Sequence, residues 1–165
     1  MMTIALLRSR PLLLRLRVVF AALLLASMLL PGRGVASPGV DADYPPVTLP
    51  SFVDQSRTPA GQRIILRPTP VSFVATIHRM PEQQTTRYLK QVMNMMQVSA
   101  AGDVSQRIVV RYGDNQYLPL YINDEAAARL GEQAQAGEQR RFYALHVYNY
   151  SKGPALIVVS FGGRE

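Results

Sequence analysis

The chain contains two histidines, His78 and His146, and each falls late in a segment with the alternating polarity of a β-strand. A histidine base needs a nucleophile beside it, yet no serine lies in a Gly-x-Ser-x-Gly elbow. No recognised metal-ligand spacing is present, and Asp103, Asp114 and Asp124 fall at turns or helix caps, where aspartates usually bond to local backbone. Cysteine is absent. The sequence therefore predicts a protein that is not an enzyme and that uses neither a metal nor a cofactor.

Tyrosine, arginine and histidine side chains are better placed for binding than for catalysis. If Ile108, Val110, Leu118, Leu120 and Ile122 face the core, alternation puts Arg107, Arg111, Tyr117 and Tyr121 on the opposite face. Applied to the outer strands, the same rule adds Thr76, His78, Arg140, His146 and Tyr148. Tyrosine and arginine are favoured at interfaces because they combine apolar area with directional hydrogen bonds. The alternative is a solvated face on which aromatic side chains merely pair across strands.

From this set, six residues form the predicted binding surface: Arg107, Arg111, Tyr117, Tyr121, His146 and Tyr148. Such a surface suits an extended polymer, a glycan or a partner protein. Nucleic acid is not expected, because strand 116–122 lacks the glycine-aromatic pattern of RNA-recognition domains.

Strands and helices alternate in the part of the chain that must position these residues. The predicted strands are 63–67 continued by 71–78 after a bend at Pro68 and Pro70, 107–112, 116–122, 140–150 and 155–161. Predicted helices cover 82–97, with Pro81 in the first turn, and a segment capped by Asn123 or Asp124 that runs through Leu130. In the first helix Tyr88, Leu89, Val92, Met93 and Met96 form one apolar stripe, which we interpret as core rather than as a metal site.

The order of these elements predicts an α+β fold. Strand, helix, strand, strand, helix, strand matches the ferredoxin-like split βαβ sandwich, with the last strand extending the sheet as a hairpin. Its helices would cover one face of an antiparallel sheet. The alternative is an OB-like barrel, which also places a helix between its third and fourth strands and would carry 82–97 as an inserted helix.

The charge of the chain is concentrated at its start. The 165 residues carry a formal charge of +7, yet residues 1–36 hold five arginines and no acidic residue, which leaves 13 basic and 11 acidic residues beyond them. A basic start, the uncharged run 18–30 and small residues before Ser37 predict a signal peptide cleaved after Ala36. The alternative is an uncleaved membrane anchor, although the run is shorter than the roughly 20 residues of a spanning helix.

These features together predict an exported, cysteine-free domain. Residues 37–60, rich in proline, are expected to form an irregular tether, and residues 61–165 a single domain. The small charge that remains after cleavage also argues against nucleic acid. We expect a periplasmic or secreted, non-enzymatic binding or assembly-accessory domain of a bacterial envelope that contacts a protein or polymer and keeps no stable membrane anchor. The alternatives are a small periplasmic hydrolase with His78 or His146 as base, and an OB-like domain that binds an anionic ligand.

Overall fold

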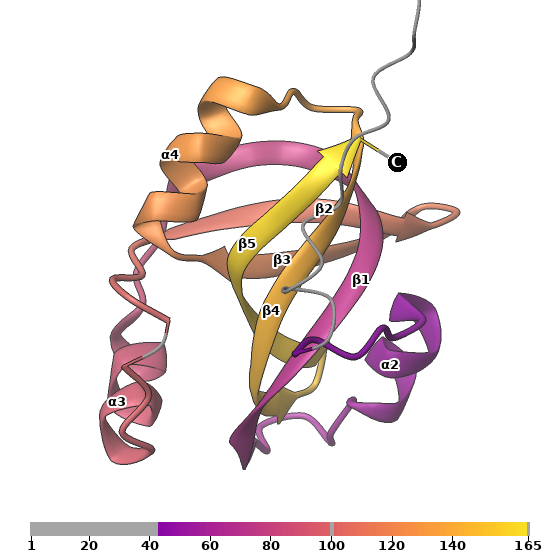
Figure 1. The fold of residues 1–165 in the computed structure, drawn as a ribbon. Helices are drawn as coiled ribbons and strands as arrows, with labels where there is room; N and C mark the ends of the chain where they lie inside the picture. Colours follow the sequence, from indigo (N-terminus) through magenta and orange to yellow (C-terminus); the bar gives the residue numbers. More distant parts are fainter. Residues whose placement is uncertain (1–42, 100, 165) are drawn as a thin grey trace, which may run out of the picture. The chain divides into compact units, whose positions relative to one another are not determined.

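Five strands close into a barrel in the computed structural model, which describes residues 43–99 and 101–164 (Figure 1). In chain order the elements are α2 (Leu49–Gln55), β1 (Ile64–Gln83), α3 (Arg87–Met95), β2 (Gln106–Gly113), β3 (Gln116–Ile122), α4 (Asp124–Gln133), β4 (Gln139–Tyr150) and β5 (Gly153–Arg164). The predicted signal peptide, residues 1–36, lies outside the described residues. No helix in the described ranges is long and apolar enough to cross a bilayer.

The long strand β1 is what closes the barrel. Its 20 residues pair antiparallel with β4 over Ile64–Thr76 and with β2 over Thr76–Gln83. The predicted bend at Pro68 is present as a register shift between Ile65 and Thr69, but the strand continues through it. It also continues past Pro81, where a helix was predicted, so α3 begins only at Arg87.

The neighbour order β1-β2-β3-β5-β4, closed back onto β1, fits the OB-like alternative, and the ferredoxin-like arrangement is wrong. The mixed fold is dominated by strands, with α3 between β1 and β2 and α4 between β3 and β4, as that alternative requires. The physical reason for the error is the length of β1. Because it stays extended to Gln83 and reaches both β2 and β4, the sheet closes on itself and leaves no open face for two helices to cover.

The barrel interior contains the side chains that alternation predicted for the core. Ile108, Val110, Leu118, Leu120 and Ile122 are each at most 1% exposed and pack with Phe73, Phe142 and Leu130. The alternation of β2 and β3 is therefore confirmed, and the opposite residues of both strands lie on the outside of the barrel.

A second apolar cluster lies on the outside of the barrel beneath α3. Leu89, Val92 and Met93 of the helix pack there with Leu145, Val147, Tyr148, Ala155 and Ile157 of β4 and β5. Tyr88 and Met96 are partly buried against the same cluster, so the predicted apolar stripe is confirmed as packing. Both faces of β4 are covered as a result.

Residues 43–60 differ from the irregular tether that was predicted. Leu49 and Val53, one helical turn apart, are 2% and 0% exposed in α2, and Pro50 lies in the first turn, where proline is tolerated. Upstream, the Val47 amide donates to the Ser72 carbonyl at 2.7 Å and the Ser72 amide donates to the Pro45 carbonyl at 2.9 Å. The segment is therefore part of the folded domain.

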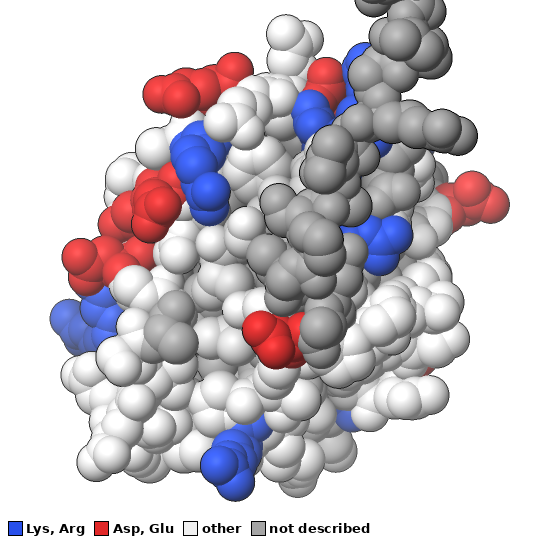
Figure 2. Space-filling model, viewed as in Figure 1, with Lys and Arg blue, Asp and Glu red and all other residues white. Residues whose placement is uncertain are grey.

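Helix α4 begins with the predicted cap, since the Asn123 side chain accepts from the Ala126 amide at 2.7 Å. Asp124 and Glu125 occupy the first turn, where acidic side chains favour the helix dipole. In Figure 2 several acidic side chains lie along this helix, with basic side chains beside them.

Candidate binding site

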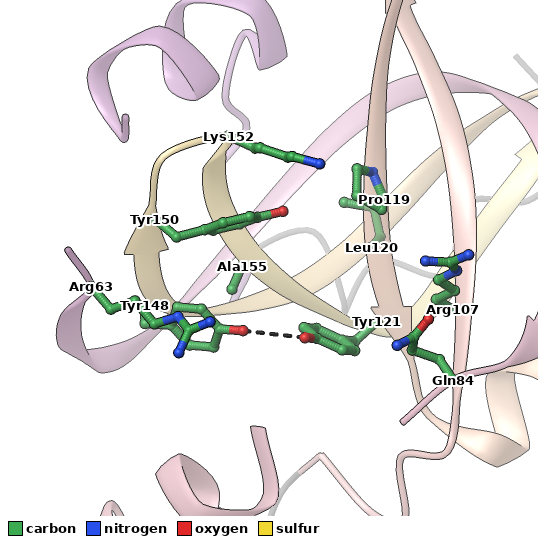
Figure 3. A pocket seen from close by; sticks show the side chains of 10 residues that line it. All are labelled: Arg63, Gln84, Arg107, Pro119, Leu120, Tyr121, Tyr148, Tyr150, Lys152 and Ala155. Atoms are coloured by element: carbon green, nitrogen blue, oxygen red, sulfur yellow. Dashed lines mark hydrogen bonds between the residues drawn. The ribbon is translucent and has the colours of Figure 1, made fainter. Parts of the chain in front are cut away.

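A cleft of about 210 Å³ lies where β3 and β5 stop pairing (Figure 3). The parallel ladder between these strands has only two pairs, Tyr121 with Ile157 and Ile122 with Val158. Toward the starts of the strands stand Pro119 in β3 and Pro154 in β5, and neither residue has an amide N–H with which to extend a ladder. Two prolines thus favour an opening in a barrel that is otherwise closed.

The lining of this cleft combines tyrosine rings with cations. It consists of Arg63, Gln84, Arg107, Pro119, Leu120, Tyr121, Tyr148, Tyr150, Lys152 and Ala155. Three of these side chains are cationic and none is acidic. The lining residues come from β2, β3, β4 and β5 and from three connecting segments, which contribute Arg63, Gln84 and Lys152. In Figure 3 Lys152 and Tyr150 extend across the opening toward Pro119.

Two tyrosines meet across the cleft through their hydroxyls. Tyr121 Oη and Tyr148 Oη lie 3.2 Å apart, so one hydroxyl donates to the other and the proton of the acceptor hydroxyl is left to point elsewhere. Burial raises the pKa of Tyr148 well above its usual value, and the hydrogen bond to Tyr121 raises it further. Burial likewise raises the pKa of Tyr150. Both phenols therefore stay protonated at neutral pH and act as neutral hydrogen-bonding groups.

No protein-family model matches this chain, and no curated protein matches it.

Two of the cations in the lining are already oriented by neighbours. The Arg63 guanidinium carbon lies 4.1 Å from the centroid of the Tyr88 ring, within cation–π range. Arg107 forms an ion pair with Glu82, with 2.8 Å between Nη2 and Oε1, and both side chains are partly exposed. Neither contact neutralises the lining completely, because Arg63 keeps its charge and Lys152 adds another. The cleft therefore favours an anionic ligand.

Three of the six predicted binding residues meet here, namely Arg107, Tyr121 and Tyr148. Arg111 and Tyr117 pair with each other farther along the outer face of β2 and β3, in a second hollow that Thr76 and His78 also line. There the rings of His78 and Tyr117 lie 4.4 Å apart. The predicted surface is thus divided between two places on one face.

His146 is not part of either place. It is 7% exposed, its ring lies 5.0 Å from that of Phe52, and its Nε2 lies 2.7 Å from Asn149 Oδ1. Alternation failed because Phe142 and Ala144, on the same side of β4, belong to the barrel interior, so His146 points inward as well. A register shift between His146 and Tyr148 then turns Tyr148 to the outer cluster.

Arg140, also expected outside, is held at the barrel rim. Its guanidinium pairs with Glu138 and donates to the Gln133 carbonyl at 2.8 Å, with a side chain only 11% exposed. It reaches neither the cleft nor the second hollow.

Sequence reasoning missed Arg63, Tyr150 and Lys152. Arg63 precedes β1, Tyr150 is the last residue of β4, and Lys152 lies in the turn between β4 and β5. Under the OB-like alternative, Tyr150 and Lys152 could have been proposed from the sequence, because the loop between the fourth and fifth strands commonly binds ligands in that fold. Among the described residues, no three histidine or acidic side chains gather as a metal site would require.

Proposed function

We propose that this chain is a non-enzymatic binding protein that holds an anionic ligand in the cleft between β3 and the β4–β5 turn. The observation that carries the proposal is the composition of the cleft, which places Arg63, Arg107 and Lys152 around tyrosine rings and no acidic side chain among them. Cations select the negative group of a ligand. Rings and hydroxyls offer it apolar area and hydrogen bonds. The position of the cleft is the one that OB-fold proteins use for oligomeric ligands, an analogy of fold that adds support.

The hydrolase alternative has less support from the geometry. His146 bonds to an amide oxygen beneath Phe52 rather than to a serine or a carboxylate. His78 packs against the Tyr117 ring. Tyr148 and Tyr150 of the cleft have raised pKa values, so they stay protonated at neutral pH and do not serve as general bases. Export to the periplasm or medium, predicted from residues 1–36, completes the proposal and would bring the domain to envelope or extracellular polymers.

An NMR titration with an acidic disaccharide of glucuronate and N-acetylglucosamine tests this function. The backbone and ring signals of Tyr121 and Tyr150 should shift on binding, and a neutral disaccharide of N-acetylglucosamine should bind at least about tenfold more weakly, since a hydrogen bond to a charged group contributes roughly 1.5–3 kcal/mol. Raising the salt concentration should weaken binding of the acidic sugar.

The two lysines of the chain provide a matched pair of variants. Lys152→Gln removes a cation from the cleft, whereas Lys90→Gln removes an exposed cation from α3. Only the first should weaken binding of the acidic disaccharide. Equal effects of both changes, or equal affinity of the wild-type protein for acidic and neutral sugars, would refute the proposal.

A further inference from the structure

The three cations that line the cleft differ in how much of their charge is already compensated. Arg107 registers with Glu82 across β1 and β2, and its Nε and Nη2 both lie 2.8 Å from the same carboxylate oxygen, Oε1. Arg63 and Lys152 have no carboxylate partner within the part of the chain that the structure describes. The net positive charge of the lining therefore belongs to Arg63 and Lys152.

The compensated cation and the uncompensated ones start from different sides of the cleft. Figure 3 shows Arg63 against Tyr148 on one side, and Arg107 on the opposite side, where β2 and β3 lie. Lys152 belongs to the β4–β5 turn, next to the end of β4 with which the start of β1 pairs. A negative group is drawn to the Arg63 side, because the carboxylate of Glu82 offsets the attraction of Arg107 on the other side.

Arg63 is held at the cleft by a residue that is not part of the lining. Its guanidinium carbon lies 4.1 Å from the centroid of the Tyr88 ring, within cation–π range. The same ring meets the Tyr148 ring edge-on, with 5.2 Å between the centroids and 90° between the planes. Tyr88 thus contacts a cation and an aromatic wall of the cleft at once.

The position of Tyr88 is fixed by the first turn of α3. Thr86 Oγ1 donates to the Val104 carbonyl at 3.0 Å, and Leu89 is fully buried in the apolar cluster beneath the helix. An OB-like barrel has its own helix between the third and fourth strands, so α3 is an addition to that fold. Through Tyr88 the added helix reaches the cleft.

The backbone of Arg63 is fixed as well. Arg63 immediately precedes β1, which pairs with the end of β4, and upstream the Thr58 amide donates to the Tyr150 carbonyl at 3.2 Å. Only the long side chain of Arg63 is left to be restrained, and the Tyr88 ring restrains it. A cation that is oriented before the ligand arrives loses less conformational freedom on binding, which favours affinity.

We propose that Tyr88 is a positioning residue of the cleft, which holds Arg63 in place for the negative group of the ligand. That group lies on the side of Arg63 and Lys152, and an uncharged part of the ligand lies toward Arg107. The ligand class is therefore an acid with its negative group at one end and a neutral remainder, as in a uronic acid joined to a neutral sugar. This inference rests on the proposed function and adds which cations recognise the charge and which residue outside the lining orients them.

The first experiment compares the cations. Calorimetric titrations give the ratio of the affinities for the acidic disaccharide of glucuronate and N-acetylglucosamine and for the neutral disaccharide of N-acetylglucosamine. Arg63→Gln should lower this ratio at least about threefold, because a charge-assisted hydrogen bond to the negative group is lost. The double variant Glu82→Gln with Arg107→Gln is the matched control. It removes a pair without net charge and should keep the ratio within about twofold of the wild-type value.

The second experiment isolates the role of Tyr88. Tyr88→Leu keeps an apolar side chain in the cluster but removes the ring, and should lower the ratio about two- to fivefold, the range of a cation–π contact at an exposed site. Tyr88→Phe keeps the ring and should keep the ratio. In a chain that already carries Arg63→Gln, Tyr88→Leu should change the ratio by less than about 1.5-fold, because no guanidinium remains to be positioned.

The outcomes separate this inference from the function on which it rests. A wild-type protein that bound the acidic and neutral disaccharides equally would overturn both. A preference for the acidic disaccharide that survived Arg63→Gln, or that disappeared in the control double variant, would overturn the position of the negative group and leave the proposed function intact. Tyr88→Leu without effect on the ratio, or with the same effect whether or not Arg63 is present, would overturn the positioning role. Binding of the neutral disaccharide verifies that each variant remains folded.

Discussion

The hydroxyls of Tyr121 and Tyr148 lie 3.2 Å apart although their strands, β3 and β4, are separated by β5 in the barrel. Ala155 of β5 registers with Tyr148, and its small side chain leaves room for the two rings to meet (Figure 3). The hydrogen bond spans the place where the β3–β5 ladder ends. It therefore joins the two sides of the cleft without filling it.

We expect the Tyr121–Tyr148 contact to be visible as energetic coupling. Tyr121→Phe and Tyr148→Phe should each lower the free energy of unfolding by about 1 kcal/mol, the usual net contribution of one hydrogen bond. The double variant should lower the free energy of unfolding by little more than either single variant, because both changes remove the same hydrogen bond. Urea denaturation measures all three. Tyr117→Phe, at an exposed hydroxyl, is the control and should be near neutral, while additive losses at 121 and 148 would contradict the coupling.

Stability should depend on pH through His146. Burial lowers the pKa of this imidazole, although its hydrogen bond to Asn149 opposes the shift. The unfolded chain therefore binds the proton more readily, so the free energy of unfolding should fall as the pH drops from 7 through the ordinary value of 6.5, by at most about 1.4 kcal/mol per pH unit. The pKa of Glu138 is lowered chiefly by its hydrogen bond to Arg140. The stabilisation that this carboxylate contributes is therefore lost only as the pH falls below its ordinary pKa of 4.5.

Urea titrations between pH 7 and about pH 5 would isolate the histidine term, since that window lies above the range in which carboxylates titrate. His146→Gln should flatten the dependence. His78→Gln, which removes the exposed histidine, should keep it because His146 remains. A slope that persisted in His146→Gln would assign the dependence to another group.

Gly153 should be intolerant of a side chain. Its φ of +122° disfavours other residues, and a Cβ there would lie 2.9 Å from Val53 Cγ1 of α2. Gly153→Ala should therefore lower the free energy of unfolding by roughly 2–4 kcal/mol, through backbone strain and displacement of the helix. In the same strand Gly163 has no neighbour within 4 Å of such a Cβ, so Gly163→Ala should change stability by less than about 0.5 kcal/mol. Thermal unfolding of the two variants compares them directly, and equal stabilities would contradict the contact with α2.

Gly131 is a position where the chain should gain stability. It lies inside α4, and a Cβ there would meet nothing within 4 Å. Gly131→Ala should raise the free energy of unfolding by about 0.5–1 kcal/mol, because alanine loses less backbone entropy in a helix. Circular dichroism during urea denaturation measures the change. A lower urea midpoint for Gly131→Ala would show that the end of α4 requires a backbone conformation that only glycine allows.

The local pattern of the sequence predicted the parts of the fold that depend on neighbours along the chain. The hairpin of β2 and β3, the cap at Asn123, the apolar stripe of α3 and the inward side chains of the hairpin are all present. Each follows from turn chemistry or side-chain period within a few residues. Those same periods placed Arg107, Arg111, Tyr117 and Tyr121 on one outer face.

Predictions failed where the outcome depends on partners distant in the chain. Residues 79–83 become strand because β2 provides a ladder for them, and α2 is held by burial of Leu49 and Val53 against the barrel. Residues 142–148 form a nearly continuous apolar run, typical of a strand covered on both sides, so alternation of polarity could not give the direction of His146. Arg63 and Lys152 enter the cleft only because barrel closure brings the start of β1 and the β4–β5 turn beside β3.

The sequence by itself thus determined most of the strands and helices, most of the core and four outward side chains, because side-chain periods of two or of 3.6 residues depend on neighbours along the chain. Tertiary structure alone decided between sandwich and barrel, since that choice depends on one strand pairing with two others across most of the chain. It also decided where the site lies. Pro119 and Pro154 are separated by more than thirty residues, and only closure of the barrel brings their strands together at the opening that the tyrosines line.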